Sequence, residues 1–442
     1  MKCKKILTAL LAAACTMSGC HGDLDIMQDN KLSASNMWID ESDAETATYG
    51  IYLYMRDALK SVHDIYLCWG EFRNGLWGAG TNKTLSGVDQ TQVRTSTMSS
   101  SNAYADWSVM YKTVNQANLI LKHVPEMGIS ESVRNFSLGN AYFSRAWCYF
   151  WIARIWGDAP LALTGYESTA GDLYLPRAPK AEIFARIESD LTEAERYVTD
   201  NSDKAVATPA AVQMLKADYA LWMYRVAGGG SSYLTMAEEA IETLNLSASR
   251  LESDYAQVFS SANKLNKEVI FAVHQANGEA VNGPGYYLGW NSNYVEAAYQ
   301  NNPVPITGGN QWWWYTDRYK ALLTSVEGDT RTKLTYNRAD YGTTIKSIEW
   351  TEKGVGQMIS GARIFDSDFI LYRYAEAFLM DAEIKYYRKD YGGALTALGE
   401  ITKRAYGNAA HYTDQSEAAV KRAIVEELSL IHISEPTRPI SI

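Results

Sequence analysis

The chain has 442 residues, of which 47% are hydrophobic and 21% charged, and a formal net charge of −10. This composition is typical of a folded protein with a large core, and the acidic balance argues against nucleic-acid binding, which requires basic surface. Aromatic residues are unevenly distributed, with 30 Tyr and 13 Trp against 10 Phe. The excess lies in side chains with a polar group, which suit half-wet binding surfaces.

The N-terminus has the pattern of a lipoprotein export signal over residues 1–19. Lysines occupy three of the first five positions, and the apolar stretch 6–14 is too short to span a bilayer. Small residues directly precede Cys20, which is the predicted site of lipidation. An ordinary secretory signal and lipidation at Cys15 are the alternatives. The sequence thus predicts a mature protein anchored to a membrane through lipid.

Two cysteines lie in the body of the chain, Cys68 and Cys148. An oxidising compartment permits a disulfide between them. Cys148, however, lies in a strongly apolar helical segment, which favours a buried thiol.

The predicted elements are mostly helices in pairs. The segment 138–156 is apolar nearly all round, as buried helices are, and Pro160 prevents its continuation. Apolar residues at helical spacing predict a helix over 180–198. Thr208 and Pro209 have the pattern of a helix start, and the segments 209–226 and 233–244 form the next predicted pair. The last pair, 369–406, places Ala382 and Ala394 at the spacing at which tetratricopeptide-type helices cross; a helical hairpin unrelated to such repeats is the alternative.

Two long segments lack helical periodicity. The first is 66–102, and the second is 274–361, which follows the strand-like run 268–273. Loops of this length in a compact domain are usually functional or disordered, and their tryptophan content argues against disorder. The predicted fold class is therefore mainly α: tetratricopeptide-like helix pairs as a scaffold over 20–427, long loop-rich insertions and a few short strands.

The C-terminus changes character. An amphipathic helix is predicted over 418–427, and the following segment 428–442 breaks its pattern without a cap. That segment resembles a translated sequencing adaptor and is predicted to be non-native; a natural tail is the alternative.

The loop 274–361 contains the densest group of candidate binding residues. Three consecutive indoles cannot all face one core, since they alternate along a strand and fan out around a helix. We therefore expect exposed indoles that stack on sugar rings, although aromatics that merely pack the loops are the competing interpretation. The candidates here are Tyr287, Trp290, Tyr294, Trp312, Trp313 and Trp314.

A second group of candidates lies in the loop 66–102. It combines a carboxylate, a guanidinium, an amide and an indole, which together offer stacking and bidentate hydrogen bonds to a sugar. An ordinary loop pinned by its own aromatics fits the same residues. The candidates are Glu71, Arg73, Asn74 and Trp77.

Signals for catalysis are missing from the sequence. The histidines are scattered without metal-binding spacing, and no nucleotide-binding or nucleophile pattern is present. We therefore expect no enzyme activity, no metal and no cofactor. Arg373, Glu376 and Glu383 are predicted to form an internal ion-pair network.

Several segments, taken in order, resemble the SusD/RagB lipoproteins of Bacteroidota. Each is weak alone, but behind a lipoprotein signal their order is specific. They are the segments 43–52, 107–118, 145–161, 176–191, 328–331 and 371–376, which include Trp107, Asn118, Arg145, Asp190 and Arg331.

This resemblance implies an α-helical fold, a place on the outer face of the outer membrane, and capture of oligosaccharides for a SusC-like TonB-dependent transporter. The family's binding positions fall in loops similar to 71–77 and 287–314. The family pattern continues beyond Glu427 with a segment that this chain lacks, so the resemblance also implies a C-terminal truncation. Capture of peptides, a helical glycoside hydrolase and a scaffold that binds only protein remain alternatives.

Overall fold

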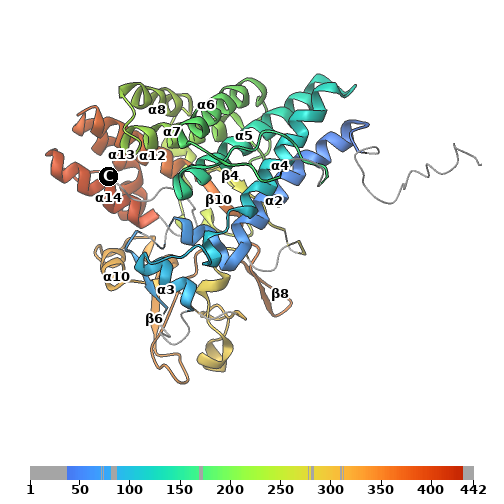
Figure 1. Ribbon diagram of the computed structural model, residues 1–442. Helices are drawn as coiled ribbons and strands as arrows, with labels where there is room; N and C mark the ends of the chain where they lie inside the picture. Colours follow the sequence, from blue (N-terminus) through green and yellow to red (C-terminus); the bar gives the residue numbers. More distant parts are fainter. Residues whose placement is uncertain are drawn as a thin grey trace, which may run out of the picture.

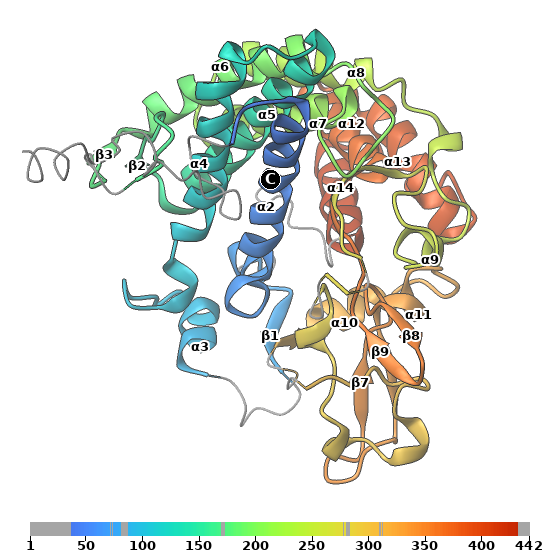
Figure 2. The same ribbon diagram turned by 90° about the vertical axis from the view of Figure 1, so that its right-hand side faces the viewer.

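The computed structural model describes residues 37–70, 72, 74–80, 87–168, 173–276, 278–279, 283–308, 311 and 313–431. The predicted signal 1–19, Cys20, Glu71, Arg73, Trp312 and the segment 432–442 lie outside these residues. Figures 1 and 2 show a layer of helices above a second part that is made mostly of loops and short strands. The layer of helices is called the helical half below, and the rest the loop half.

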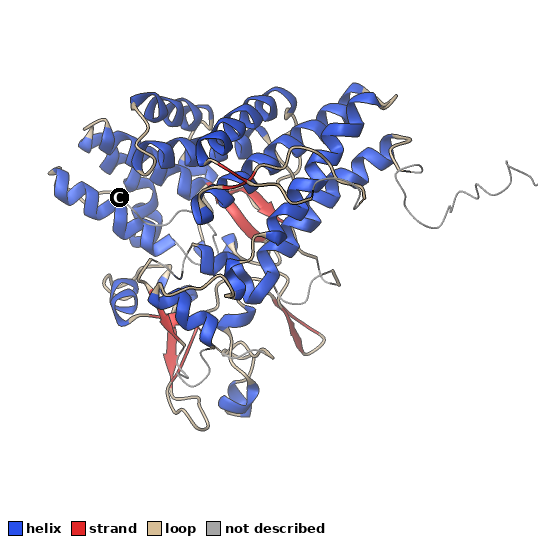
Figure 3. Ribbon diagram, in the orientation of Figure 1, coloured by secondary structure: helices blue, strands red, loops and turns tan. Residues whose placement is uncertain are grey.

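The helical half is built from helices that pack against their neighbours in sequence. α5 packs on α6, α7 on α8, and α12 on both α13 and α14, while α2 packs on α4 and α5. The bounds are α2 Glu41–Trp69, α4 Ser108–His123, α5 Glu131–Trp156, α6 Lys180–Tyr197, α7 Pro209–Arg225, α8 Ser231–Thr243, α12 Tyr374–Tyr387, α13 Tyr391–Tyr406 and α14 Glu417–Ile431. The predicted mainly α fold is confirmed, and Figure 3 shows how few strands accompany these helices.

Local chemistry explains where these helices begin and how closely they pack. The Thr208 side chain accepts a hydrogen bond from the Ala211 N–H, and Pro209 occupies the first turn of α7, as predicted. α5 approaches α6 closely at Gly139, where an added Cβ would lie 2.7 Å from Val198 Cγ2. Ala382 and Ala394 are fully buried where α12 meets α13. The helix pairs are thus joined at small residues that let their backbones come together.

Three predicted boundaries are wrong. α2 continues to Trp69, past the predicted loop start at residue 66, because Ile65, Tyr66 and Leu67 are all buried. Phe369–Arg373 is not helical but forms strand β10, which pairs antiparallel with β4 Val269–Val273. α14 runs to Ile431 rather than ending at Glu427, since Leu428 and Ile431 extend its buried face.

The loop half contains several small antiparallel ribbons, each of two strands. Short helices connect them, and Figure 1 places most of them below the helical half. The ribbons are β1 Trp77–Ala79 with β5 Trp313–Tyr315, β6 Asn337–Ala339 with β7 Ile348–Trp350, and β8 Gln357–Ile359 with β9 Ala362–Ile364. A further ribbon, β2 Ala159–Pro160 with β3 Arg177–Ala178, lies beside the helices. The short helices are α3 Val88–Thr95, α9 Tyr255–Val258, α10 Asp317–Leu323 and α11 Thr332–Thr335.

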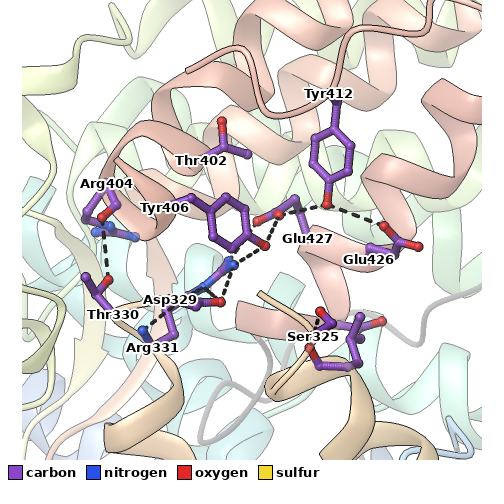
Figure 4. Close-up of polar contacts among 12 residues, drawn as sticks. Ser325, Asp329, Thr330, Arg331, Thr402, Arg404, Tyr406, Tyr412, Glu426 and Glu427 are labelled. Atoms are coloured by element: carbon purple, nitrogen blue, oxygen red, sulfur yellow. Dashed lines mark hydrogen bonds and ion pairs between the residues drawn. The ribbon is translucent and has the colours of Figure 1, made fainter. Parts of the chain in front are cut away.

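A buried polar network joins α14 to the segment before α11 (Figure 4). The Arg331 guanidinium donates to Asp329 Oδ2 at 2.9 Å and to Glu427 Oε2 at 2.7 Å. Tyr406 Oη accepts from Arg331 at 2.6 Å and donates to Glu427 Oε1 at 2.8 Å. Both carboxylates are paired with the one guanidinium and Tyr406 donates to Glu427, so each buried charged group has a hydrogen-bond partner.

The predicted ion-pair network around Arg373 is confirmed in part, with different partners. Arg373 lies in β10 and pairs with Glu268 at 2.7 Å, and Glu383 on α12 pairs with Arg225 at 3.1 Å. The first contact joins β10 to the residue before β4, and the second joins α7 to α12, so both pairs are structural.

Cys68 and Cys148 are both buried and are not joined by a disulfide. Burial raises the pKa of the Cys148 thiol. Within the described residues, no helix combines the length and the apolarity that a lipid bilayer demands of a spanning segment.

Candidate functional site

The two groups of candidate residues meet in space. β1 and β5 pair antiparallel, with Trp77 opposite Tyr315, Gly78 opposite Trp314 and Ala79 opposite Trp313. Positions more than 230 residues apart in sequence thereby become neighbours on one ribbon. The sequence placed both groups in loops but gave no sign that they pair.

Aromatic rings on this ribbon pack against one another. The Phe72 ring stacks on Trp313, with centroids 3.8 Å apart and an angle of 19° between the planes. Trp77 contacts Phe72 and Tyr315 edge to face, each at 4.8 Å. Trp314 stacks on Tyr315 at 4.4 Å. These five residues are called the aromatic floor below.

The expectation that the candidate indoles face water is wrong for every one that the structure describes. Trp77 is 3% exposed, and Trp290, Trp313 and Trp314 are each 1% exposed. Strand alternation does point neighbouring indoles to opposite sides, but this short ribbon is covered on both sides. Phe72 covers Trp313, and Tyr315 and Glu349 cover Trp314. These indoles therefore support the loops and have no free face for a sugar.

Glu349 is the polar centre beneath the floor. Its Oε2 accepts from Trp314 Nε1 at 2.7 Å and pairs with Lys320 Nζ at 2.7 Å, and its Oε1 accepts from Tyr336 Oη at 3.0 Å. Burial and the nearby Glu349 carboxylate raise the pKa of Tyr336 to about 12. Since both carboxylate oxygens are engaged, Glu349 is placed to hold the loops rather than to transfer protons.

Trp290 belongs to a separate small core. It packs with Val295, Val304, Ile348 and Trp350, and its Nε1 donates to the Glu349 carbonyl at 2.8 Å. The Glu349 residue thus anchors both tryptophan clusters, through its backbone on one side and its carboxylate on the other.

The remaining described candidates are half-buried in the loop half. Asn74 Oδ1 accepts from the Leu76 N–H at 2.9 Å and shapes the turn that leads into β1. Tyr287 packs edge to face on Tyr286 at 5.0 Å, and Tyr294 packs on Trp290 at 6.1 Å. The described candidates with partly accessible side chains are therefore Asn74, Tyr287 and Tyr294.

A second aromatic surface, which the sequence analysis did not propose as a site, lies in the helical half. Trp107, Tyr111, Tyr166 and Tyr174 line a groove of about 430 Å³, and Tyr174 is 92% exposed. The spacing of Trp107 and Tyr111, one helical turn apart, was the available signal. The amide side chains that line this groove bind backbone carbonyls. Asn115 Nδ2 donates to the Tyr166 carbonyl at 3.1 Å, and Asn118 Nδ2 donates to the Ala162 carbonyl at 2.9 Å.

Among the described residues, no three or more His, Cys, Asp or Glu side chains are grouped so that they could hold a metal ion.

Known proteins share this sequence pattern and this architecture. A SusD-like family profile, described as starch-binding associating with outer membrane, matches residues 79–222. SusD-like protein P38 of Formosa agariphila is 23% identical over 420 residues, which cover 89% of this chain and 78% of the relative. A SusD superfamily protein of Bacteroides fragilis, solved by crystallography, is 26% identical with a TM-score of 0.77, and the match covers 90% of this chain and 87% of that one. The chain is therefore SusD-like in sequence and in fold.

Two further solved structures share its fold. The B. fragilis protein NanU is 25% identical, with a TM-score of 0.76, and the match covers 93% of this chain and 90% of NanU. Surface glycan-binding protein A from Bacteroides thetaiotaomicron, solved in complex with laminarihexaose, is 16% identical with a TM-score of 0.70, over 88% of this chain and 87% of that one.

Most of the residues in the segments that resemble the SusD family hold the helices of this protein together. Arg145 on α5 pairs with Asp190 on α6 at 2.7 Å and donates to Asn118 Oδ1 on α4, also at 2.7 Å. Arg331, in another of these segments, holds α14 through Glu427. These segments therefore identify the fold, while the ligand contacts have to be sought in the loops.

Proposed function

We propose that this SusD-like chain is a cell-surface protein that binds oligosaccharides with its loop half and passes them to a SusC-like TonB-dependent transporter. The description of the matching family profile, starch-binding associating with outer membrane, supports the ligand class and the location. Surface glycan-binding protein A, which has the same fold, has been solved with an oligosaccharide bound. The relatives found are SusD-like proteins rather than enzymes, which favours binding over catalysis.

The observation that carries this proposal is the pairing of β1 with β5. It joins the two candidate groups on one ribbon, and the stacking of Phe72 on Trp313 helps to fix that ribbon. A binding surface whose backbone is held rigid before the ligand arrives loses less entropy on binding. The loop half therefore provides a preorganised place for a sugar chain.

The proposed ligand contacts are the sequence candidates other than the buried indoles. Glu71, Arg73 and Asn74 flank Phe72 in sequence, and Trp312 directly precedes Trp313. Phe72 and Trp313 stack on each other, so these candidates come from two segments that meet at one ring contact. Tyr287 and Tyr294 complete the proposed set from the half-buried residues.

Attachment to the outer membrane is proposed to be through lipid on Cys20. The peptidase pattern before Cys20 supports this, and several acyl chains at about 0.8 kcal/mol per buried methylene would anchor the protein firmly. Metabolic labelling with a fatty acid would test it: label on the wild-type protein and none on Cys20→Ser is expected. Equal labelling of both would contradict the assignment.

Isothermal titration against plant, mucin and microbial oligosaccharides tests the ligand class. We expect binding of one class of glycan, with Trp312→Ala weakening it roughly tenfold or more, as is common for aromatic hot-spot residues. The matched control is Tyr54→Ala, which removes an exposed aromatic of α2 outside both aromatic surfaces and should leave binding unchanged.

Other outcomes would replace the proposal. Heat from peptides and from no glycan would make the protein a peptide-capturing relative, and cleavage of a bound glycan would make it a hydrolase. Co-purification of the tagged protein with an outer-membrane transporter, tested in cells, is the expected result for the partner. Its absence under conditions that preserve such complexes would remove the delivery step.

A further inference from the structure

A cavity of about 460 Å³ opens in the helical half, away from the aromatic floor. It lies between the start of α7, the turn after α8, strand β4 and the start of α12, and these elements are in the upper layer in Figure 1. The side chains that matter for the argument are Lys204, Arg250, Asn245 and Tyr374. We call this cavity the basic pocket.

Two cations line the basic pocket without a carboxylate partner. Lys204 Nζ donates to the Asn266 carbonyl at 2.5 Å, and no ion pair within 4.0 Å among the described residues involves Lys204 or Arg250. Burial lowers the pKa of Lys204, and the nearby Arg250 lowers it further, while Glu252 has a smaller opposing effect. Two like charges thus face one cavity, in a protein whose net charge is −10.

The guanidinium of Arg250 is held in place by an aromatic ring rather than by an anion. Its Cζ lies 5.1 Å from the centroid of the Tyr374 ring, a cation–π contact. That contact fixes the group from one face and leaves its N–H donors free for a planar acceptor such as a carboxylate.

The start of α7 adds to the positive potential in the pocket. Thr208, Pro209 and Ala210 form part of its wall, so the positive end of the dipole of this 17-residue helix borders the cavity. Asn245 also lines the pocket and supplies a neutral amide. Cations, a helix start and an amide around one concave space are the groups that recognise an anion with a polar body.

We propose that the basic pocket binds the anionic group of an acidic sugar, a carboxylate or a sulfate ester. The volume suits one or two sugar rings, since small-ligand sites are typically about 300–1,000 Å³. Arg250 grips the anion and Lys204 compensates its charge from the half-buried side. This inference rests on the proposed glycan-binding function, and it assigns to the helical half a second site that selects for charge.

Titration with monosaccharides at constant ionic strength tests the proposal. Sodium D-glucuronate and D-glucose 6-sulfate should bind and neutral D-glucose should not, and the stronger of the two anions identifies the preferred group. Arg250→Gln, at an exposed position that folding tolerates, should weaken anion binding about tenfold or more, because a charge-assisted bond is lost. The matched control is Lys346→Gln, which removes one exposed cation from the loop half and should change nothing.

Two results would overturn the inference: no binding of either anion, or equal weakening by Arg250→Gln and Lys346→Gln, which would mean that only net charge matters. Failure of the proposed function is distinguishable. Trp312→Ala should weaken oligosaccharide binding about tenfold or more and leave glucuronate binding unchanged. Arg250→Gln should weaken glucuronate binding and leave the binding of neutral oligosaccharides unchanged. If glucuronate binds and no oligosaccharide does, the pocket stands and the proposed function falls.

Discussion

Neighbouring tryptophans in β5 differ in what their indole N–H groups do. Trp314 Nε1 donates to Glu349 at 2.7 Å, whereas no described residue accepts from Trp313 Nε1, although both rings are 1% exposed. A buried donor without a partner costs free energy, and a satisfied one contributes to stability. The two side chains thus form a natural matched pair.

We expect Trp314→Phe to lower the free energy of unfolding more than Trp313→Phe does, by about 1–3 kcal/mol. Both variants lose similar volume, but only the first removes a hydrogen bond and leaves Glu349 with one donor fewer. Urea unfolding followed by circular dichroism measures the difference. Equal losses would mean that the Trp314–Glu349 bond adds nothing to stability.

His274 introduces a pH dependence into the loop half. Its Nδ1 lies 3.0 Å from Asp368 Oδ1, and that contact raises the pKa of His274 above 6.5, while burial and Lys264 oppose the shift. A pKa that is raised in the folded state stabilises the protein fully below the unfolded value, and this contribution disappears as pH rises through the folded value.

His274→Gln should therefore reduce the free energy of unfolding at pH 6 and have a smaller effect at pH 8.5. The comparison is made between wild type and variant at each pH, so that groups common to both cancel. An equal loss of unfolding free energy at pH 6 and pH 8.5 would show that the ion pair with Asp368 does not contribute to stability.

At the scale of single residues, the sequence predicted which segments carry the aromatics but not which side chains meet water. The burial of Trp313 depends on Phe72, and the burial of Trp290 depends on Val304 and Trp350. Such contacts join distant parts of the chain, and neither periodicity nor composition contains them.

Elements were predicted better where they are long. The helices corresponding to α5, α6, α7 and α8 follow from apolar periodicity and from the Thr208–Pro209 start. Strand β4 was predicted and its partner β10 was not, because a short apolar run such as 369–373 fits a helix as well as a buried strand. The ribbons of three-residue strands in the loop half leave too little pattern to predict.

The C-terminal helix depends on one ion pair. Arg331 and Glu427 are both fully buried, and their contact at 2.7 Å joins α14 to the segment before α11 (Figure 4). Removing Glu427 leaves Arg331 paired with Asp329 but deprives Arg331 and Tyr406 of a buried acceptor, and a buried donor left without its acceptor costs about 1–3 kcal/mol.

Glu427→Ala should therefore lower the free energy of unfolding by about that amount and increase hydrogen exchange in α14 before other helices. The control is Glu426→Ala, since Glu426 accepts only a long bond of 3.4 Å from Tyr412 and is half-buried. If the two variants behave alike, α14 is held by apolar packing and not by this pair.

At the scale of the whole molecule, α2 links the two halves. Its first turn contacts α5 through Glu41, which accepts from the Ser130 N–H at 2.8 Å, and its last residue, Trp69, donates to the Tyr104 carbonyl at 3.0 Å. The helix has 29 residues and so extends about 43 Å at 1.5 Å per residue. In Figure 1 it runs from the helical layer down toward the loops.

A break in α2 should therefore affect both halves together. Leu53 is 47% exposed in the middle of the helix, and Leu53→Pro is expected to cost about 3 kcal/mol or more and to weaken oligosaccharide binding. Leu53→Ala, which keeps the helix, should alter neither quantity appreciably. Thermal unfolding and titration calorimetry give the two readouts; normal binding by a destabilised proline variant would show that the loop half does not depend on α2.

The aromatic floor separates stability from specificity. Its rings are interlocked with each other and with Glu349, so the outer turns above them do not have to supply the energy that keeps the chain folded. Turns from a SusD-like relative that binds another glycan could then be placed between the same ribbons, and the chimaera would fold as the parent does. With this arrangement, glycan specificity could change through substitutions in single surface turns while the fold is kept.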